Sequence, residues 1–495
     1  MSTFSTVIAI KRKETTMSGF WDFKVWGSIL VFAAIFGSLL IANIIKKSIP
    51  FMRKSLIPTS VLAGLLLLAA SAIYQGISGR VMFDEPAFNG NGMQFLEVIT
   101  YHCLALGFIA SAFKTSQNKM SKKRTVEIFD SGVTTVATYL LQAIFGLGIT
   151  LIVALIIPGF FKAAGVLLPF GFGQGSGQAL NYGTIYQNDY GFTGGSSFGL
   201  AVAALGFLSA SIGGVIHLNI SSHRGRLKAS DSEECAITAE EVQAANEIPM
   251  QESVDKLTLQ IALIGFAYFI AYLMMWGLGA LLPGMKSTIY GFNFLLGVIS
   301  ATLVKTVLRF LRRRNVIKKE YTNNFLLTRT SNFFFDIMVV AGIAAIQIET
   351  LKTYWGVLLI LGAVGMAITF IYTRFVSKVL FKEYAEEQFL ATYGMLTGTA
   401  STGIILLREV DKDFRTPAAD NLVYQTFPAI VFGFPMMLLA NWAPKSPYWC
   451  LVVFVAFFAA MNLILFRSKL FRFGKKKTAA AEESPDAVED DGHAE

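Results

Sequence analysis

Apolar residues along this chain come in repeated runs of about twenty residues, separated by short segments that carry most of the charge. A helical run of that length crosses a hydrocarbon core about 30 Å thick, because each residue adds about 1.5 Å. The pattern therefore predicts an all-α polytopic membrane protein. We expect eleven spans, at 25–45, 57–76, 95–113, 129–157, 195–222, 257–282, 288–311, 325–348, 354–380, 420–441 and 449–467.

Two further apolar segments are rich in glycine and hydroxyl residues, and they differ from the spans. The first, 163–187, contains Gly171-Phe172-Gly173-Gln174-Gly175-Ser176-Gly177. Glycines at a spacing of two do not share one helical face, and each costs a helix about 1 kcal/mol. We expect a re-entrant hairpin with a broken tip, and the alternative is a packed helix with small residues.

The second such segment, 385–407, occupies the corresponding place in the second half of the chain. It contains Tyr393-Gly394-Met395-Leu396-Thr397-Gly398-Thr399-Ala400-Ser401-Thr402-Gly403, which has fewer glycines and more hydroxyls. We predict a second re-entrant hairpin here. Neither segment has the Gly-Lys-Ser/Thr of a phosphate-binding loop.

Composition agrees with the membrane assignment. The 495 residues are 54% hydrophobic and only 15% charged, whereas soluble domains carry about 25% charged residues. These values exclude an ordinary soluble enzyme, a disordered chain and a fibrous protein. The net charge of +9 then indicates loop topology, and we expect no nucleic-acid partner.

The distribution of lysine and arginine predicts the orientation. If both Gly-rich segments are re-entrant, 32 of the 42 basic residues lie on one side, nine lie on the other, and Arg329 lies within a span. Since basic loops stay cytoplasmic, we expect a cell-membrane protein with its N-terminus outside and its C-terminus in the cytoplasm. The cluster Lys11–Lys13 is the local exception, which a start at Met17 would remove.

The order of these segments predicts two repeats. Each half has five spans and one Gly-rich segment in the same order, the second half has one further span at its end, and an odd number of spans inverts the second copy in the membrane. We predict five regions. They are an N-terminal extension (1–24), a first membrane repeat (25–222), a cytoplasmic linker (223–256), a second repeat with one extra terminal helix (257–470) and a disordered cytoplasmic tail (471–495).

The tips of two such hairpins would meet near the membrane midplane. Half-helix N-termini present free N–H groups to an anion, whereas unwound carbonyls and hydroxyls suit Na⁺. The predicted substrate-binding residues are Gln174, Gly175, Ser176, Gly177, Thr397, Gly398, Thr399, Ser401, Thr402 and Arg329. The predicted Na⁺ ligands are Asp336, Asn332, Gly173 and Thr399.

Arg329, Asn332 and Asp336 enter this prediction because they share one helical stripe within a predicted span. Ionisable groups at membrane depth are costly and usually face a cavity or a partner. The alternative is a structural Arg–Asp bridge or helix packing through the asparagine. The three cysteines and four histidines show no disulfide or metal-ligand spacing, and no catalytic motif is present, so we expect no enzyme and no cofactor.

At these segments the chain resembles the bacterial sodium–glutamate symporter family, over most of residues 25–441. Ile57-Pro58 followed by Val61 and Gly64 is similar to that family's Ile-Pro-x-x-Val-x-x-Gly stretch. The strings that carry the rest of the resemblance are Gly173-Gln174-Gly175-Ser176-Gly177, Tyr190-Gly191-Phe192-Thr193, Ile212-Gly213-Gly214, the set Gly394, Gly398 and Thr402, and Pro428. Gln174, Phe172, Met436 and Asp336 depart from the family pattern.

The resemblance implies a homodimer in the lipid bilayer, with substrate and Na⁺ bound around the hairpin tips. It implies sodium-coupled uptake of glutamate or a related small organic anion by an elevator-like alternating-access mechanism. The alternatives are a proton- or sodium-coupled carrier of another carboxylate on the same fold, and a channel or sensor. A channel normally needs a continuous polar pore, whereas polarity here concentrates at two tips.

Overall fold

The computed structural model describes residues 19–54, 57–114, 121–223, 247, 254–411 and 415–467, and these form helices joined by short connections. The first half contains α2 (Phe23–Ser48), α3 (Pro50–Lys54), α4 (Thr59–Ser78), η1 (Met82–Asp84), η2 (Pro86–Phe88), α5 (Gly92–Phe113), α6 (Lys122–Ile156), η3 (Ala164–Val166), η4 (Pro169–Gly173), α7 (Ser176–Tyr190) and α8 (Gly195–His223). The second half contains α10 (Lys256–Leu281), η5 (Pro283–Met285), α11 (Lys286–Gly291), α12 (Asn293–Arg313), α13 (Asn324–Ala344), α14 (Ile348–Leu351), α15 (Trp355–Leu380), η6 (Lys382–Tyr384), α16 (Ala385–Leu396), α17 (Ala400–Arg408), α18 (Ala418–Tyr424), α19 (Thr426–Trp442) and α20 (Pro447–Leu465).

Long apolar helices dominate this architecture. Within the described residues, ten helices are long and apolar enough to cross a membrane, and there are eleven if α18 and α19, which are bent by 48° to each other, count as one span. This confirms the prediction of an all-α polytopic membrane protein with about eleven spans. Residues 1–18, most of the linker and the predicted tail lie outside the described residues.

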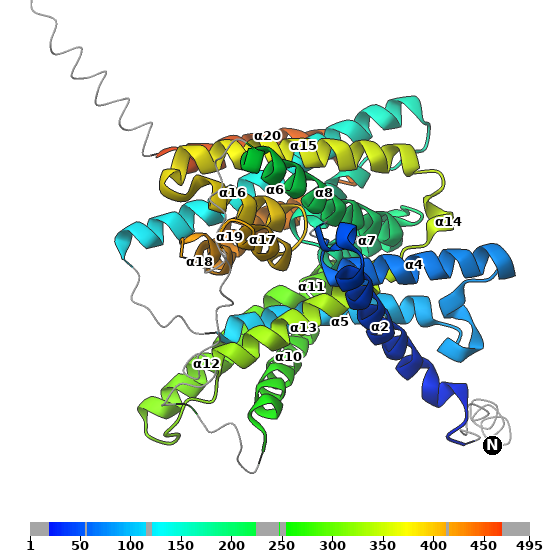
Figure 1. Cartoon of the computed structure of the whole chain (residues 1–495), viewed down its shortest axis with the longest axis horizontal. Coiled ribbons are helices and arrows are strands. Elements are labelled where there is room, and N and C mark those ends of the chain that lie inside the picture. The colour runs from blue at the N-terminus through cyan, green and yellow to red at the C-terminus, as the bar shows by residue number, and fades with distance from the viewer. Residues whose placement is uncertain are drawn as a thin grey trace, which may run out of the picture.

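The helices gather into two bundles, which lie one above the other in Figure 1. The first bundle comprises α2, α4, α5, α10, α11, α12 and α13. The second bundle comprises α6, η3, η4, α7, α8 and the helices from α15 to α20. Each half of the chain thus contributes its early helices to the first bundle and its later helices to the second.

Helix contacts in the two halves correspond pairwise. α2 packs on α4 as α10 packs on α12, and α4 packs on α13 as α12 packs on α5. In the second bundle, α6 packs on α19 as α15 packs on α8. Two repeats would produce such a correspondence, and both the repeats and their opposite orientation in a bilayer stay predictions.

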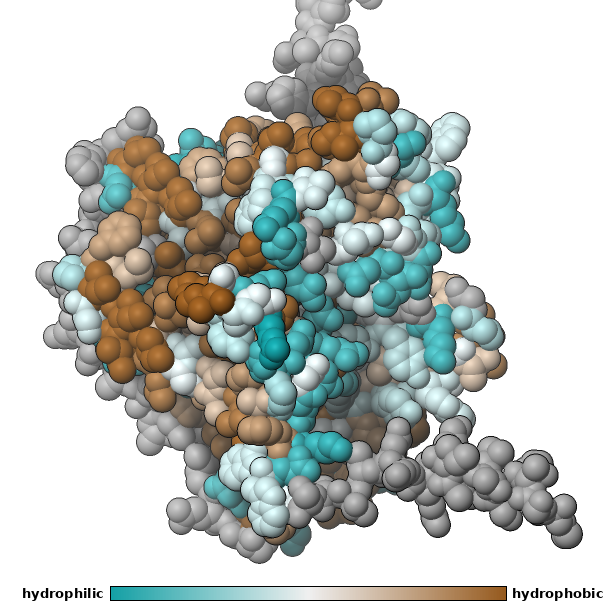
Figure 2. Space-filling model, turned by 90° about the vertical axis from the view of Figure 1, so that its right-hand side faces the viewer, coloured by the Kyte–Doolittle hydropathy of each residue, from teal (hydrophilic) through white to brown (hydrophobic). Residues whose placement is uncertain are grey.

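Large apolar side chains cover the outside of the described helices. Trp276 on α10, Ile44 on α2 and Trp449 on α20 are each more than half exposed. Figure 2 shows the face at the end of the molecule where α14 lies, with hydrophilic residues through its middle and hydrophobic patches bordering them. This is the distribution expected of helices whose sides contact lipid and whose ends contact water.

A buried ion pair fixes the start of α10. The Lys256 ammonium is fully buried and donates to Glu247 Oε2 at 2.7 Å. The Asn323 side-chain amide donates to the same oxygen at 2.6 Å. Glu247 therefore ties the start of α10 to the residue that caps α13.

We predict that Lys256→Met destabilises the protein by about 3–5 kcal/mol, because it leaves the Glu247 carboxylate buried without its cation. Thermal unfolding in detergent measures this loss. The control is Lys352→Met, which breaks an ion pair with Glu349 whose side chains are 65% and 63% exposed. That exposed pair is worth at most about 1 kcal/mol, so equal effects of the two substitutions would contradict the assignment.

Candidate functional site

The longest helix of the second bundle, α6, provides the reference for locating the site. Its 35 residues extend about 52 Å at 1.5 Å per residue. Two interrupted segments pack along it. We call η3, η4 and α7 the first hairpin, and α16 and α17 the second hairpin.

The base of the first hairpin lies near the C-terminal end of α6. Thr150 Oγ1 donates to the Lys162 carbonyl at 2.7 Å, just before the hairpin begins. The rings of Phe161 and Phe192 stack with centroids 4.6 Å apart. Because these two residues flank the segment, the chain leaves this end of α6 and returns to it.

The base of the second hairpin lies at the opposite end of α6. Lys123 Nζ donates to Glu383 Oε1 at 2.8 Å, just before the hairpin begins. Arg124 Nη2 donates to Asn421 Oδ1 at 3.0 Å, and Asn421 Nδ2 donates to the Tyr384 hydroxyl at 3.1 Å. Residues on both sides of the second hairpin therefore gather around the N-terminus of α6.

The tips of the two hairpins meet at the middle of α6. Tyr139 donates its hydroxyl to the Gly173 carbonyl at 3.1 Å, and Gln142 Nε2 donates to the Leu396 carbonyl at 3.0 Å. A Cβ placed on Gly175 would lie 3.5 Å from the carbonyl oxygen of Gly398. Two segments more than 200 residues apart in sequence thus touch at their breaks.

Each break separates two half-helices. The first lies between η4, which ends at Gly173, and α7, which begins at Ser176. Its central residue, Gly175, has φ +81°, a conformation that other residues rarely adopt, and no side chain caps α7. The first-turn N–H groups of α7 therefore have no capping side chain to donate to. They can donate to another partner, and they lie at the positive end of the helix dipole.

The predicted hydroxyls of the second tip serve the backbone of their own half-helices. Thr397 Oγ1 donates to the Tyr393 carbonyl at 2.7 Å in the last turn of α16. Thr399 caps α17, since its hydroxyl accepts from the Thr402 N–H at 3.4 Å and lies 3.3 Å from the Thr402 hydroxyl. The Ser401 side chain lies outside the described structure.

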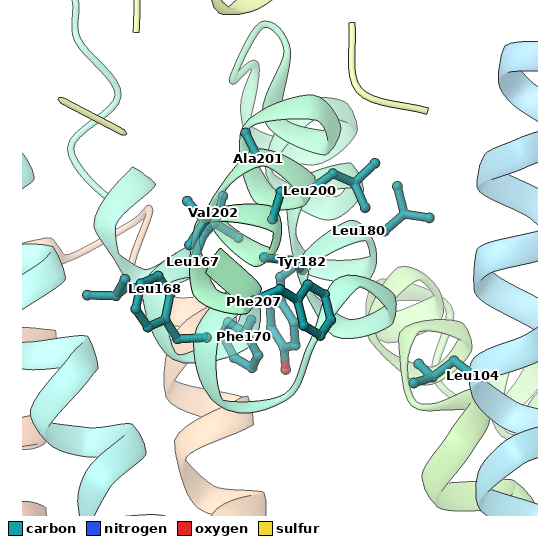
Figure 3. Packing of buried hydrophobic residues seen from close by; sticks show 14 of the residues in the cluster. Leu104, Leu167, Leu168, Phe170, Leu180, Tyr182, Leu200, Ala201, Val202 and Phe207 are labelled. Carbon is teal, nitrogen blue, oxygen red and sulfur yellow. The ribbon is translucent and has the colours of Figure 1, made fainter. Parts of the chain in front are cut away.

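The predicted residues of the first tip lie between the two bundles. Gly173, Gly175, Ser176 and Gly177 are buried, and Gln174 is half-buried. A Cβ on Gly342 of α13 would lie 3.1 Å from the Ser176 hydroxyl, and a Cβ on Gly177 would lie 2.7 Å from a methyl of Leu104 on α5. Figure 3 shows the apolar packing behind this tip, where Phe170 and Tyr182 of the hairpin lie close to Phe207 of α8.

Unpaired buried polar atoms concentrate at the first tip. Seven buried side-chain nitrogen or oxygen atoms in the described part of the chain have no hydrogen-bond partner, and four belong to Gln142, Ser176 and Gln178. Buried polar groups are almost always paired, so this concentration favours a ligand site. Sequence reasoning missed both glutamines, although Gln142 is a polar residue in the middle of a predicted span, which is itself a signal.

The stripe of Arg329, Asn332 and Asp336 lies elsewhere on α13. All three are exposed, and the Arg329 guanidinium lies 5.1 Å from the Phe325 ring centre on the same helix. Asp336 lies beside Ser60 of α4. Asp336, the nearest of the three to the first tip, lies about 9 Å along the helix from Gly342, which meets that tip, and Arg329 lies about 20 Å from it.

No protein-family model matches the chain, and no curated protein matches it.

A close contact between α8 and the two tips leads to a stability prediction. A Cβ on Gly206 would lie 2.7 Å from the Thr397 carbonyl oxygen and 3.2 Å from Phe172 Cα, both backbone atoms. We expect Gly206→Ala to cost about 1–3 kcal/mol of stability, measured by thermal unfolding in detergent. The control, Gly277→Ala on α10, has no atom within 4 Å of the added carbon, and it should be neutral or stabilising.

Proposed function

We propose that this multi-pass membrane protein is a secondary transporter that takes up a small organic anion, such as glutamate, together with Na⁺. The observation that carries the proposal is the meeting of two helix breaks at the midpoint of α6. Discontinuous helices whose breaks converge at mid-membrane are typical of binding sites in secondary transporters.

The half-helix ends support an anionic substrate. α7 and α17 both begin at the breaks, so two positive dipole ends converge there. The unpaired Ser176 hydroxyl and Gln178 amide add donors on the same hairpin. A carboxylate satisfies such donors, and an analogue lacking it would leave them unpaired.

The two-bundle arrangement supports alternating access. Both hairpins belong to the second bundle, and a ladder of tyrosine hydroxyls fixes α7 to α19 within it. Tyr182, Tyr186 and Tyr190 donate to the carbonyls of Met437, Ala440 and Asn441 at 2.9, 2.7 and 2.9 Å. A rigid second bundle that slides along α5 and α13 would carry the whole site across the membrane, as in an elevator.

The composition of the tips favours Na⁺ over H⁺ as the coupling ion. Residues 173–178 and 396–402 contain carbonyls, amides and hydroxyls but no side chain that titrates near neutral pH. Oxygen dipoles of this kind coordinate Na⁺. The resemblance to the sodium–glutamate symporter family supports the same ion, and it also supports a homodimer.

We predict that proteoliposomes containing the protein accumulate labelled glutamate, or another small carboxylate, at least tenfold faster with an inward Na⁺ gradient than with choline. The reason is that Na⁺ must occupy its site before the anion is held. Protein-free liposomes are the control. Uptake that is equally fast in choline would exclude Na⁺ symport, and ohmic single-channel currents would favour a channel.

Cysteine labelling tests the proposed orientation of the chain in the membrane. Lys382 follows α15 and Lys445 follows α19, and both are exposed. In a cysteine-free background in whole cells, we expect a membrane-impermeant maleimide to label Lys445→Cys and not Lys382→Cys. Permeabilised cells, in which both should react, are the control. The reverse labelling would invert the proposed topology.

A further inference from the structure

We propose that the Gln142 side-chain carbonyl is a ligand of the coupling cation, at a site between α6 and the C-terminal ends of the two half-helices that precede the breaks. This inference deepens the proposed function and rests on it. Gln142 lies on neither hairpin, and the pattern of glycines and hydroxyls does not point to it.

Hydrogen bonding fixes which way the Gln142 amide faces. Its nitrogen lies 3.0 Å from the Leu396 carbonyl and 2.8 Å from Thr369 Oγ1 of α15. A backbone carbonyl only accepts, so the group facing Leu396 must be the NH₂. The amide oxygen therefore points away from the second hairpin and toward the first, where it lies 3.2 Å from the position of a Gly173 Cβ.

That oxygen has no partner in a fully buried position. Gln142 is 0% exposed and its Oε1 accepts no hydrogen bond. Leaving a buried acceptor unpaired costs about 1–3 kcal/mol, so the position favours a ligand that supplies positive charge. The surrounding atoms exclude large ligands, because a Cβ on Gly173 would already lie 2.2 Å from the Tyr139 ring.

The ends of the half-helices specify the sign of that ligand. Gly173 ends η4 and Leu396 ends α16, so both carbonyls lie at negative, C-terminal ends. Gln142 contacts both ends from the α6 side. C-terminal ends of broken helices and unwound carbonyls coordinate Na⁺ in transporters, whereas the N-terminal ends face anions. The charge of a monovalent cation suits this position.

The Gly173 carbonyl offers the cation a second oxygen ligand. It accepts one hydrogen bond, from the Tyr139 hydroxyl, and a carbonyl oxygen has a second lone pair. A cation held by Gln142 and Gly173 is adjacent to the first tip, while the amide nitrogen of the same glutamine holds the second. Binding of the cation would thus stabilise the contact between the tips, on which the anion site depends.

Two substitutions separate the oxygen from the nitrogen of the amide. Gln142→Met has a similar length and neither group. Gln142→Glu keeps an oxygen toward the first tip and loses the donor to Leu396. We expect Gln142→Met to raise the half-saturating Na⁺ concentration about tenfold or more, and Gln142→Glu to change it less than about threefold.

The measurements are Na⁺-dependent uptake in proteoliposomes and the Na⁺-dependent rise in unfolding temperature without substrate. The control is Gln260→Met on α10, a buried glutamine whose amide groups are both paired, which should leave Na⁺ half-saturation unchanged. An unchanged value in Gln142→Met, or an equal rise in Gln142→Glu, overturns the inference. If Gln142→Met does not fold, a tenfold rise in Gln142→Glu overturns the inference, and a value within threefold supports it.

Measurements on the wild-type protein show whether a negative result contradicts the proposed function or only the role of Gln142. If wild-type uptake does not depend on Na⁺, both the proposed Na⁺ coupling and this inference are wrong. Wild-type uptake that requires Na⁺, combined with unchanged Na⁺ half-saturation in Gln142→Met, removes Gln142 alone and leaves the proposed function standing.

Discussion

The structure depends on how broken backbone is satisfied in the interior of a membrane protein. Each break frees N–H and C=O groups that lipid does not pair, so it is tolerated only where protein or a polar cavity receives them. Here the two breaks lie against the same turn of α6 and against each other. The side chains that bind the backbone at the breaks also determine where the hairpins end, which makes α6 the element that positions the site.

One face of α6 carries this role along much of its length. Glu127 accepts from the Tyr384 hydroxyl, Ser131 donates to Gln425, and Tyr139 and Gln142 reach the two breaks. The spacings of four, eight and three residues keep these side chains on one helical stripe. Buried polar residues on this stripe of an otherwise apolar span therefore pair with the two breaks and with residues that flank the second hairpin.

The sequence was sufficient to predict the spans and the location of the breaks. Periodic hydrophobicity specifies a spanning helix, and the observed breaks at Gly175 and at residues 397–399 fall within the two predicted segments. It was not sufficient to identify Gln142, because a polar residue within a span is a signal that does not show which helix its side chain meets. The helical stripe that contains Asp336 shows a second limit of the sequence. Helical spacing determines which residues share a face, but the neighbour that the face meets depends on tertiary packing, and here it is α4.

The dipoles of the half-helices suggest how binding of a cation and of an anion at the breaks would be coupled. At each break one half-helix ends and another begins, so every break has a negative end and a positive end within a few residues of each other. The α6 side meets the carbonyls of Gly173 and Leu396, whereas Ser176 at the start of α7 meets α13 in the other bundle. A cation on the α6 side would then lie at the negative ends of η4 and α16, and an anion on the α13 side would lie at the positive end of α7. Each ligand would lower the electrostatic cost of binding the other, which is the physical requirement for symport.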